Sequence, residues 1–332
     1  MYSVDSSLEK IDVVYTWCDG NDPLFQKERN ETLKRIDAHY VEKAHGEARY
    51  FNNDELKYSL RSIEKYMPWV NHIYVVTNKQ RPTWLANHPK ISIIDHQEII
   101  PNDLLPTFNS IMIEMYLHKI PGLSDKYIYF NDDVFVNEYL SPSFFFVKDK
   151  PVVRLTYEDK YPFLPSRDAG EDLLKNNKHF WFKTVIRAWL LAFKRYGRKE
   201  FYRPCHVADA YVKDMVIEAM RVFPELLMSN NSPFRSEYNI QRIIFNLVAL
   251  YEFGSPCRVQ KEPGIFYKLF GWRFKALEWY SRTESERTFK RILQFKPKMF
   301  SINTDETMDK SKLGATRKFL ESQFPEKSSF EV

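Results

Sequence analysis

The sequence predicts an α/β fold with a mostly parallel sheet, because short apolar runs alternate with amphipathic helical patterns. The apolar runs are rich in β-branched and aromatic residues, which favour strands. Hydrophobic residues make up 44% of the 332 residues, enough to fill a sizeable core. Sheets of this kind bind ligands beyond the carboxyl ends of their strands, so the loops after the predicted strands are candidate sites.

The predicted strands lie in the first half of the chain. They cover residues 11–17, 72–77, 91–95 and 127–130. Two helical patterns separate them. The first places Leu56, Leu60 and Ile63 on one stripe, with Asp54 as the expected N-cap. The second covers residues 108–119 and ends before a Pro-Gly pair.

The chain divides into three expected parts. Residues 1–150 form the α/β half, residues 151–204 a basic, aromatic insertion, and residues 205–332 a helical part that completes the site. Between residues 175 and 203, nine Lys or Arg stand against one acidic residue. Such a patch suits an anionic partner.

The C-terminal part is expected to be helical. Residues 208–223 read as one helix. A strong helical period from Ile240 to Tyr251 predicts another, with Ser236 as its cap.

Composition limits the function classes. Cys18, Cys205 and Cys257 match no zinc pattern and are an odd number for a disulfide framework, which favours a reducing compartment. We find no signal-peptide core and no run of roughly 18 uncharged apolar residues, so a soluble or peripheral protein is expected. The basic patch comes without a nucleic-acid-binding signature, so nucleic acid is not an expected partner.

The strongest candidate for a site is Asn131-Asp132-Asp133, directly after the last predicted strand. Adjacent carboxylates raise one another's pKa unless a cation or hydrogen-bond donors compensate. Mg²⁺ prefers one or two carboxylates together with phosphate oxygens and water, which suits a nucleotide-sugar diphosphate. A solvated turn is the alternative, because Asn and Asp also form turns.

The loop after the first predicted strand is a second candidate. Asp19 could line a nucleotide pocket, with Gly20 allowing close approach. The alternative is a tight turn that starts a helix at Pro23.

Four further residues carry suitable chemistry. His206 could act as general base on an acceptor hydroxyl or be structural. Arg235 precedes the expected cap Ser236, so it could bind a phosphate together with helix amides, or lie at the surface. Asn303 and Asp305 offer oxygen ligands after another short apolar stretch.

Taken in order, these segments resemble the Stealth family of sugar-phosphate transferases, which includes bacterial capsule polymerases. The matching stretches are IDVVYTWCDGND at residues 11–22, and a longer region from Arg49 that includes DELKYSLRSIEKYMPWVNHIYVVTN and LSDKYIYFNDDVF. His206 and Arg235 fall where the third region of that family carries a His and then an Arg.

The resemblance implies a glycosyltransferase-like (GT-A or Rossmann-like) domain that binds a UDP-sugar with Mg²⁺ or Mn²⁺. An acceptor hydroxyl would attack the phosphorus attached to the sugar and release UMP. The implied catalytic residues are His206, Asp133, Arg235 and Arg61. The implied donor-binding residues are Tyr15, Thr16, Trp17, Asp19, Gly20, Asn109, Asn131 and Asp132. The implied metal ligands are Asp132 and Asp133 with Asn303, Asp305 or both.

The expected function is transfer of an N-acetylhexosamine 1-phosphate from its UDP-sugar to a growing anionic capsular polysaccharide in the bacterial cytoplasm. Two rivals are a conventional glycosyltransferase that releases UDP and a non-catalytic polysaccharide-binding protein. The basic insertion could lie on an anionic membrane or near the export machinery, or its charges could guide the polymer. We favour the polymer, because Lys183 and Arg187 interrupt the apolar run.

Overall fold

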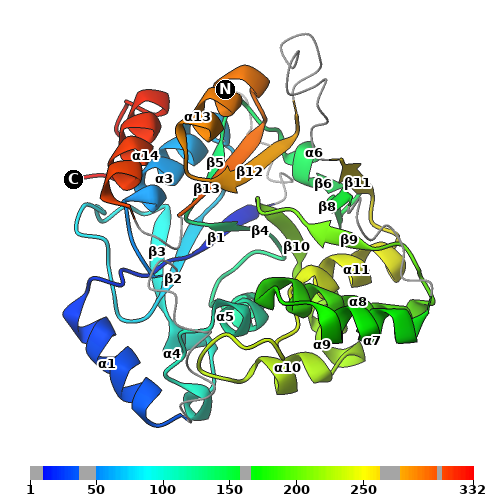
Figure 1. Cartoon of the computed structure of the whole chain (residues 1–332). Helices are drawn as coiled ribbons and strands as arrows, with labels where there is room; N and C mark the ends of the chain where they lie inside the picture. The colour runs from blue at the N-terminus through cyan, green and yellow to red at the C-terminus, as the bar shows by residue number, and fades with distance from the viewer. Residues whose placement is uncertain (1–9, 37–49, 158–165, 262–276, 305–308) are drawn as a thin grey trace.

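The computed structural model describes residues 10–36, 50–157, 166–261, 277–304 and 309–332. A five-stranded sheet forms its centre, in the order β10-β4-β1-β2-β3 (Figure 1). Neighbouring pairs among β1 to β4 are parallel, and β10 is antiparallel to β4. The expected mostly parallel α/β sheet is confirmed. The strands are β1 (Ile11–Thr16), β2 (Ile73–Thr77), β3 (Ile91–Asp95), β4 (Lys126–Asn131) and β10 (Asp209–Val212).

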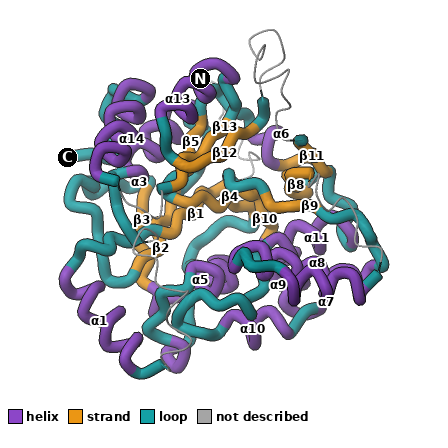
Figure 2. The backbone as a smooth tube through the Cα atoms, viewed as in Figure 1, coloured by secondary structure: helices purple, strands orange, loops and turns teal. Residues whose placement is uncertain are grey.

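Both faces of this sheet are covered, and alternation along the strands decides which residue meets which cover. Val13 and Tyr15 pack with α3 (Glu55–Tyr66), whereas Val14 packs with α5 (Ser110–Tyr116) on the other face. Figure 2 shows α5, α8, α9 and α11 together on one side of the sheet and α3 and α14 on the other. The bounds of these helices are α8 (Phe180–Tyr196), α9 (Lys213–Val222), α11 (Ile243–Tyr251) and α14 (Lys310–Gln323).

A second sheet, in the order β12-β13-β5, extends the edge of the site. Strand β5 (Val134–Val136) begins directly after Asn131-Asp132-Asp133, the acidic loop, and pairs with β13 (Met299–Asn303), which pairs with β12 (Trp279–Thr283). The Ile302 amide also donates to the Asp133 carbonyl at 3.3 Å. The C-terminal part of the chain is thereby joined to the loop that follows β4.

A third sheet, in the order β11-β8-β9, borders the insertion. Helix α8 packs its buried residues, including Trp189, into the same hydrophobic cluster as α5 and α11. The division into three parts stays a prediction, but this core crosses both proposed boundaries. The remaining elements are α1 (Pro23–Lys34), α4 (His96–Ile99), α6 (Pro142–Phe145), α7 (Arg167–Asn176), α10 (Glu225–Asn230), α13 (Glu286–Phe295), β6 (Phe146–Val147), β7 (Lys150–Pro151), β8 (Val153–Tyr157), β9 (Tyr202–Pro204), β11 (Cys257–Gln260), and the 3₁₀ turns η2 (Asn102–Leu104) and η3 (Leu117–Lys119).

The predicted strands are each confirmed to within one residue at either end. Helix α1 begins at Pro23, and the Asp22 side chain accepts from the Leu24 and Phe25 amides. Asp22 is therefore the N-cap of α1.

Asp54 occupies the N-cap position of α3, as expected, but it adopts a left-handed φ of 63° and its side chain makes no capping hydrogen bond. Two other expectations for helix starts are wrong. Residues 208–223 begin with strand β10, because its residues pair with β4, and only then continue as α9. Helix α11 begins at Ile243, so Ser236 does not cap it; its hydroxyl accepts from the Tyr238 amide in a turn instead.

The C-terminal part contains the helices α9, α10, α11, α13 and α14, as expected, but it also contributes the strands β10, β11, β12 and β13. Across the residues that the structure describes, every helix is too short or too polar to cross a membrane.

Candidate active site

Two adjoining cavities open at the carboxyl edge of the central sheet. The smaller has a volume of about 340 Å³ and follows the ends of β1, β2 and β4. The larger has a volume of about 790 Å³ and lies between the insertion, α5 and β12. Both are lined by Ser110, Asn131, His206, Arg235, Asn303 and Thr304.

The smaller cavity contains the acidic loop. Burial, with the charges of Asp133 and Glu55, raises the pKa of Asp132 well above its usual value. Burial and then the charges of Asp133 and Asp54 raise the pKa of Glu55 to about 7, although backbone amides oppose this. These three carboxylates (Glu55, Asp132 and Asp133) line the cavity together with a single arginine, Arg235. The smaller cavity therefore favours a cation.

Glu55 was not among the residues predicted from sequence. It is the first residue of α3, where an acidic side chain is also favoured by the helix dipole. The sequence alone offers no signal that separates an acidic residue placed at a helix start from one that lines a cavity.

His206 contacts the acidic loop. Its Nε2 lies 3.0 Å from Asp133 Oδ2 and 3.2 Å from Oδ1. The Ser301 hydroxyl donates to the His206 carbonyl at 2.8 Å, which fixes the backbone that carries the imidazole. An ionised carboxylate only accepts hydrogen bonds, so a neutral His206 must carry its proton on Nε2, which leaves Nδ1 as its basic nitrogen.

Arg235 lies at the junction of the two cavities. Its guanidinium donates to Ser110 Oγ, with 3.0 Å from Nε to Oγ. The expected partnership with a following helix is wrong, because α11 begins seven residues beyond Ser236. Asn303 joins this junction from β13, where its Nδ2 lies 3.3 Å from Ser281 Oγ. Asp305 lies outside the described residues.

The first loop contributes only in part. Thr16 and Trp17 line the smaller cavity. Tyr15 is buried in the core, where its hydroxyl lies 2.7 Å from Ser59 Oγ, so it is not part of the cavity wall. Asp19 Oδ1 accepts from the Asn21 amide at 2.9 Å. Gly20 packs so closely on Tyr50 that an added Cβ would lie 2.4 Å from the Tyr50 carbonyl oxygen, so its close approach is to protein.

Asn109 and Arg61 are also held within the fold. Asn109 is fully buried and caps α5, accepting from the Ile111 amide at 3.1 Å. Arg61 forms two 2.7 Å hydrogen bonds to the Glu331 carboxylate and a third to the Phe324 carbonyl. All three nitrogens of its guanidinium donate hydrogen bonds to the C-terminal segment, so we leave Arg61 out of the proposed site.

The larger cavity has the opposite charge. Its lining contains five cationic side chains and one carboxylate, Glu114. Aromatic rings from the start of α8 and from β12 form part of the same wall, including Trp181 and Trp279. This cavity therefore suits an anionic ligand with apolar faces. The cations are Arg203, Arg235, Arg242, Lys261 and Arg282.

Two basic residues of the insertion have internal partners. Lys183 pairs with Glu237, and Arg187 Nε donates to the Glu237 carbonyl at 2.9 Å. These charges fix α8 to the segment before α11. The insertion also lines the larger cavity, through the start of α8 at His179, Phe180 and Trp181 and through Arg203 of β9.

The donor set of the smaller cavity fits a magnesium-like cation. The carboxylates of Glu55, Asp132 and Asp133 and the amides of Asn131 and Asn303 line it, and burial beside Asp133 and Glu55 raises the pKa of Asp132. Within the described residues, no three His, Cys, Asp or Glu side chains are arranged to hold one metal ion. Such a cation would therefore depend on amide oxygens, water or ligand oxygens as well.

The fold and these two oppositely charged cavities define an α/β protein with a divided polar site at the sheet edge. Family models for Stealth protein conserved regions 1 and 2 match residues 9–37 and 49–153. The chain is 40% identical over 182 residues to the capsular polysaccharide phosphotransferase eps5J of Streptococcus thermophilus, covering 53% of this chain and 75% of that protein. The chain belongs to the Stealth family.

Other relatives match over different lengths. Identity is 29% over 351 residues with the capsular polysaccharide phosphotransferase WcwK of Streptococcus pneumoniae, covering 98% of this chain and 99% of that protein. The identity is 49% over 138 residues with the capsular polysaccharide phosphotransferase of Actinobacillus suis, covering 41% of this chain. Across the Actinobacillus, Aeromonas and Neisseria relatives, the chain matches only 37–46% of each protein's length.

Two solved structures show a distant likeness. The galactosyltransferase LgtC has a TM-score of 0.45 at 9% identity, covering 96% of each chain. The bifunctional glycosyltransferase WbbM has a TM-score of 0.42 at 13% identity, covering 98% of this chain and 51% of the other. A likeness at this level carries no argument about function.

Proposed function

We propose that this protein transfers a hexose 1-phosphate from a UDP-sugar to a hydroxyl of a growing capsular polysaccharide. The expected donor is a UDP-N-acetylhexosamine, and the products are a phosphodiester and UMP. One observation carries the proposal: the His206–Asp133 contact lies where a cavity that favours a cation meets a cavity that favours an anion. The names of the Stealth relatives as capsular polysaccharide phosphotransferases support it.

The smaller cavity is the proposed donor site. Thr16 and Trp17 would contact the nucleoside, while Asp132, Asp133 and Asn303 would hold Mg²⁺ or Mn²⁺. When bound, this ion neutralises diphosphate charge. Arg235 would face phosphate oxygens at the junction.

The proposed reaction is an in-line phosphoryl transfer. The acceptor oxygen forms a bond to the phosphorus attached to the sugar, and the bond from that phosphorus to the UMP oxygen breaks, with its electron pair leaving on UMP. His206 Nδ1 takes the acceptor proton, and Asp133 stabilises the resulting imidazolium. Positioning and charge neutralisation supply most of the rate in such reactions.

The larger cavity is the proposed acceptor site. Its cationic and aromatic lining suits an anionic polysaccharide, and the start of the insertion helix forms part of it. A UDP-sugar donor agrees with the expected cytoplasmic location. Contact with an anionic membrane or with export machinery stays a prediction.

The leaving group tests the proposal. The purified protein is incubated with Mg²⁺, a capsular oligosaccharide and a panel of UDP-N-acetylhexosamines, and nucleotides are separated by ion-exchange chromatography. We expect UMP in a one-to-one ratio with new phosphodiester seen by phosphorus NMR. Release of UDP would show a conventional glycosyltransferase. Donor binding without turnover on any acceptor of the panel would support a binding protein.

A further inference from the structure

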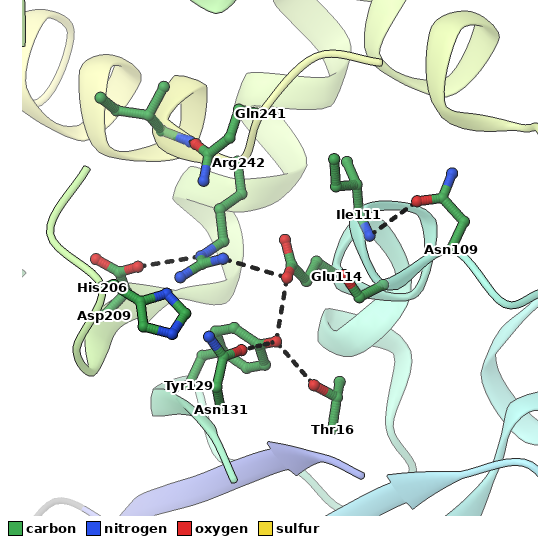
Figure 3. A network of polar contacts seen from close by, with 12 residues as sticks. Thr16, Asn109, Ile111, Glu114, Tyr129, Asn131, His206, Asp209, Gln241 and Arg242 are labelled. Atoms are coloured by element: carbon green, nitrogen blue, oxygen red, sulfur yellow. Dashed lines mark hydrogen bonds and ion pairs between the residues drawn. The ribbon is translucent and has the colours of Figure 1, made fainter. Parts of the chain in front are cut away.

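A buried polar network lies directly behind Asn131 (Figure 3). Arg242 donates to Asp209 Oδ2 at 3.1 Å and to Glu114 Oε1 at 3.2 Å. The Tyr129 hydroxyl lies 3.1 Å from the same Glu114 oxygen and 2.8 Å from Asn131 Oδ1. Arg242, Asp209, Glu114 and Tyr129 are each less than 10% exposed. The network therefore connects Asn131, at the end of β4, to β10, to α5 and to the residue that precedes α11.

The Tyr129 hydroxyl has fewer protons than hydrogen-bond partners. Thr16 Oγ1 also lies 2.8 Å from the Tyr129 hydroxyl, so that hydroxyl has three neighbours and one proton. Glu114 is paired with Arg242 and, when ionised, can only accept. A hydrogen bond to a charged acceptor is stronger than one to an amide oxygen. The Tyr129 proton therefore belongs to Glu114.

The remaining contacts must then be made by donors to Tyr129. The Thr16 hydroxyl can donate to one lone pair, but an amide oxygen cannot donate to the other. The NH₂ group of Asn131 can, and the two ends of an amide have nearly the same shape. Turning the amide over satisfies Tyr129 without moving any other atom. It also turns the Asn131 oxygen away from Tyr129, and Asn131 is a residue that lines both cavities.

We propose that Glu114 and Tyr129 are positioning residues that orient Asn131 so that its amide oxygen faces the junction of the two cavities. The identity of what binds there rests on the proposed function. An oxygen next to Asp132 suits a divalent cation or a sugar hydroxyl, since both seek a lone pair.

A stability cycle tests the orientation without any need for turnover. In Asn131→Asp, two carboxylates compete for the single Tyr129 proton, so we expect a melting temperature lower by roughly 2–6 °C. Glu114→Gln ends the competition, so adding Asn131→Asp to it should cost much less. Asp209→Asn is the matched control: it also removes a buried negative charge beside Arg242 but leaves the competition, so the full loss should persist there.

Two results would overturn the proposal. One is an Asn131→Asp variant as stable as the wild type, as expected if a neutral Glu114 lets Tyr129 donate to the Asn131 oxygen. The other is an equal rescue by Glu114→Gln and Asp209→Asn, which would reflect charge alone. Either result leaves the leaving-group test of the proposed function unaffected.

Donor binding then identifies the ligand. Tyr129→Phe removes only the hydroxyl, and we expect about fivefold weaker binding of a UDP-sugar with Mg²⁺ by calorimetry. If the variant needs a higher Mg²⁺ concentration to bind the donor, the ligand of the Asn131 oxygen is the cation. If wild type and variant bind one monodeoxy UDP-sugar equally well, the ligand is the sugar hydroxyl that this donor lacks. Unchanged binding in both arms would refute the orienting role.

Discussion

His206 Nε2 lies 3.0 Å from Asp133 Oδ2, although 73 residues separate the two side chains in sequence. The contact forms because β10, which follows His206, pairs with β4, which precedes the acidic loop. An imidazole held by a carboxylate on one nitrogen presents the other nitrogen in a fixed direction. The pair thus has the arrangement of an oriented general base.

Loss of the imidazole should slow the chemical step. We expect His206→Ala to lower kcat by roughly 10²- to 10⁴-fold while donor affinity stays within twofold. His72→Ala is the matched control, because His72 precedes β2 at the opposite edge of the sheet. Steady-state kinetics and calorimetry report the two quantities. A kcat within twofold of the wild type would remove His206 from the proposed role.

Glu55 should make the metal-free protein less stable as pH rises. Its pKa is about 7 in the folded protein against an ordinary 4.5, so the folded state binds more protons between these values. Stability contributed by the protonated form is complete below about 4.5 and is lost as pH rises through about 7. Glu55→Gln should flatten this decline in urea unfolding measured with EDTA. An unchanged slope would contradict the crowding of carboxylates.

Arg61 should stabilise the fold and leave donor binding alone. Glu331 is held below its usual pKa: burial alone would raise it, but the hydrogen bonds and charge of Arg61, with the Ser328 amide, lower it further. Removal of one partner of a buried pair costs about 3–5 kcal/mol, so Arg61→Ala should lower the free energy of unfolding by about that much.

The pH dependence of the Arg61 variant gives the sign check. A lowered pKa contributes stability that is present above the unfolded value and is lost as pH falls. Arg61→Ala should therefore lose less stability on acidification than the wild type. If the Arg61→Ala variant instead bound the UDP-sugar more weakly at unchanged stability, Arg61 would be a phosphate-binding residue.

Lys261 should contribute to acceptor binding. It lines the larger cavity and its Nζ lies 4.7 Å from the centre of the Tyr157 ring. Lys261→Ala should raise KM for an anionic acceptor by roughly 2- to 10-fold at low salt, with a smaller effect at high salt. Lys290→Ala, on the exposed face of α13, is the control. An equal rise with a neutral acceptor would contradict an electrostatic role.

Much of the fold could be read from the sequence because strand runs and helix periods are local signals. The acidic loop was found in the same way, as polar residues that follow an apolar strand. Tyr15 could have been assigned to the core, since it shares the parity of Ile11 and Val13 on β1. Its aromatic ring next to a loop drew it into the site instead.

The rest depends on tertiary contacts that local patterns do not carry. Glu55 meets the acidic loop only because α3 packs beside β5. Arg61 is taken by Glu331, which lies 270 residues away. The residues of β10 itself (Asp209–Val212) were read as the start of a helix, because the pairing of this strand with β4 joins segments that are distant in sequence. The larger cavity is likewise lined by residues of β9, β11 and β12, which are far apart in sequence.

The fate of the oxygen between the sugar and the phosphorus tests the central claim most directly. The donor is labelled with ¹⁸O at this bridging position, and products are analysed by phosphorus NMR and mass spectrometry. Attack at phosphorus keeps the label with the sugar in the new phosphodiester, and UMP leaves unlabelled. Label recovered in released UDP would mean attack at the sugar carbon and would contradict phosphoryl transfer.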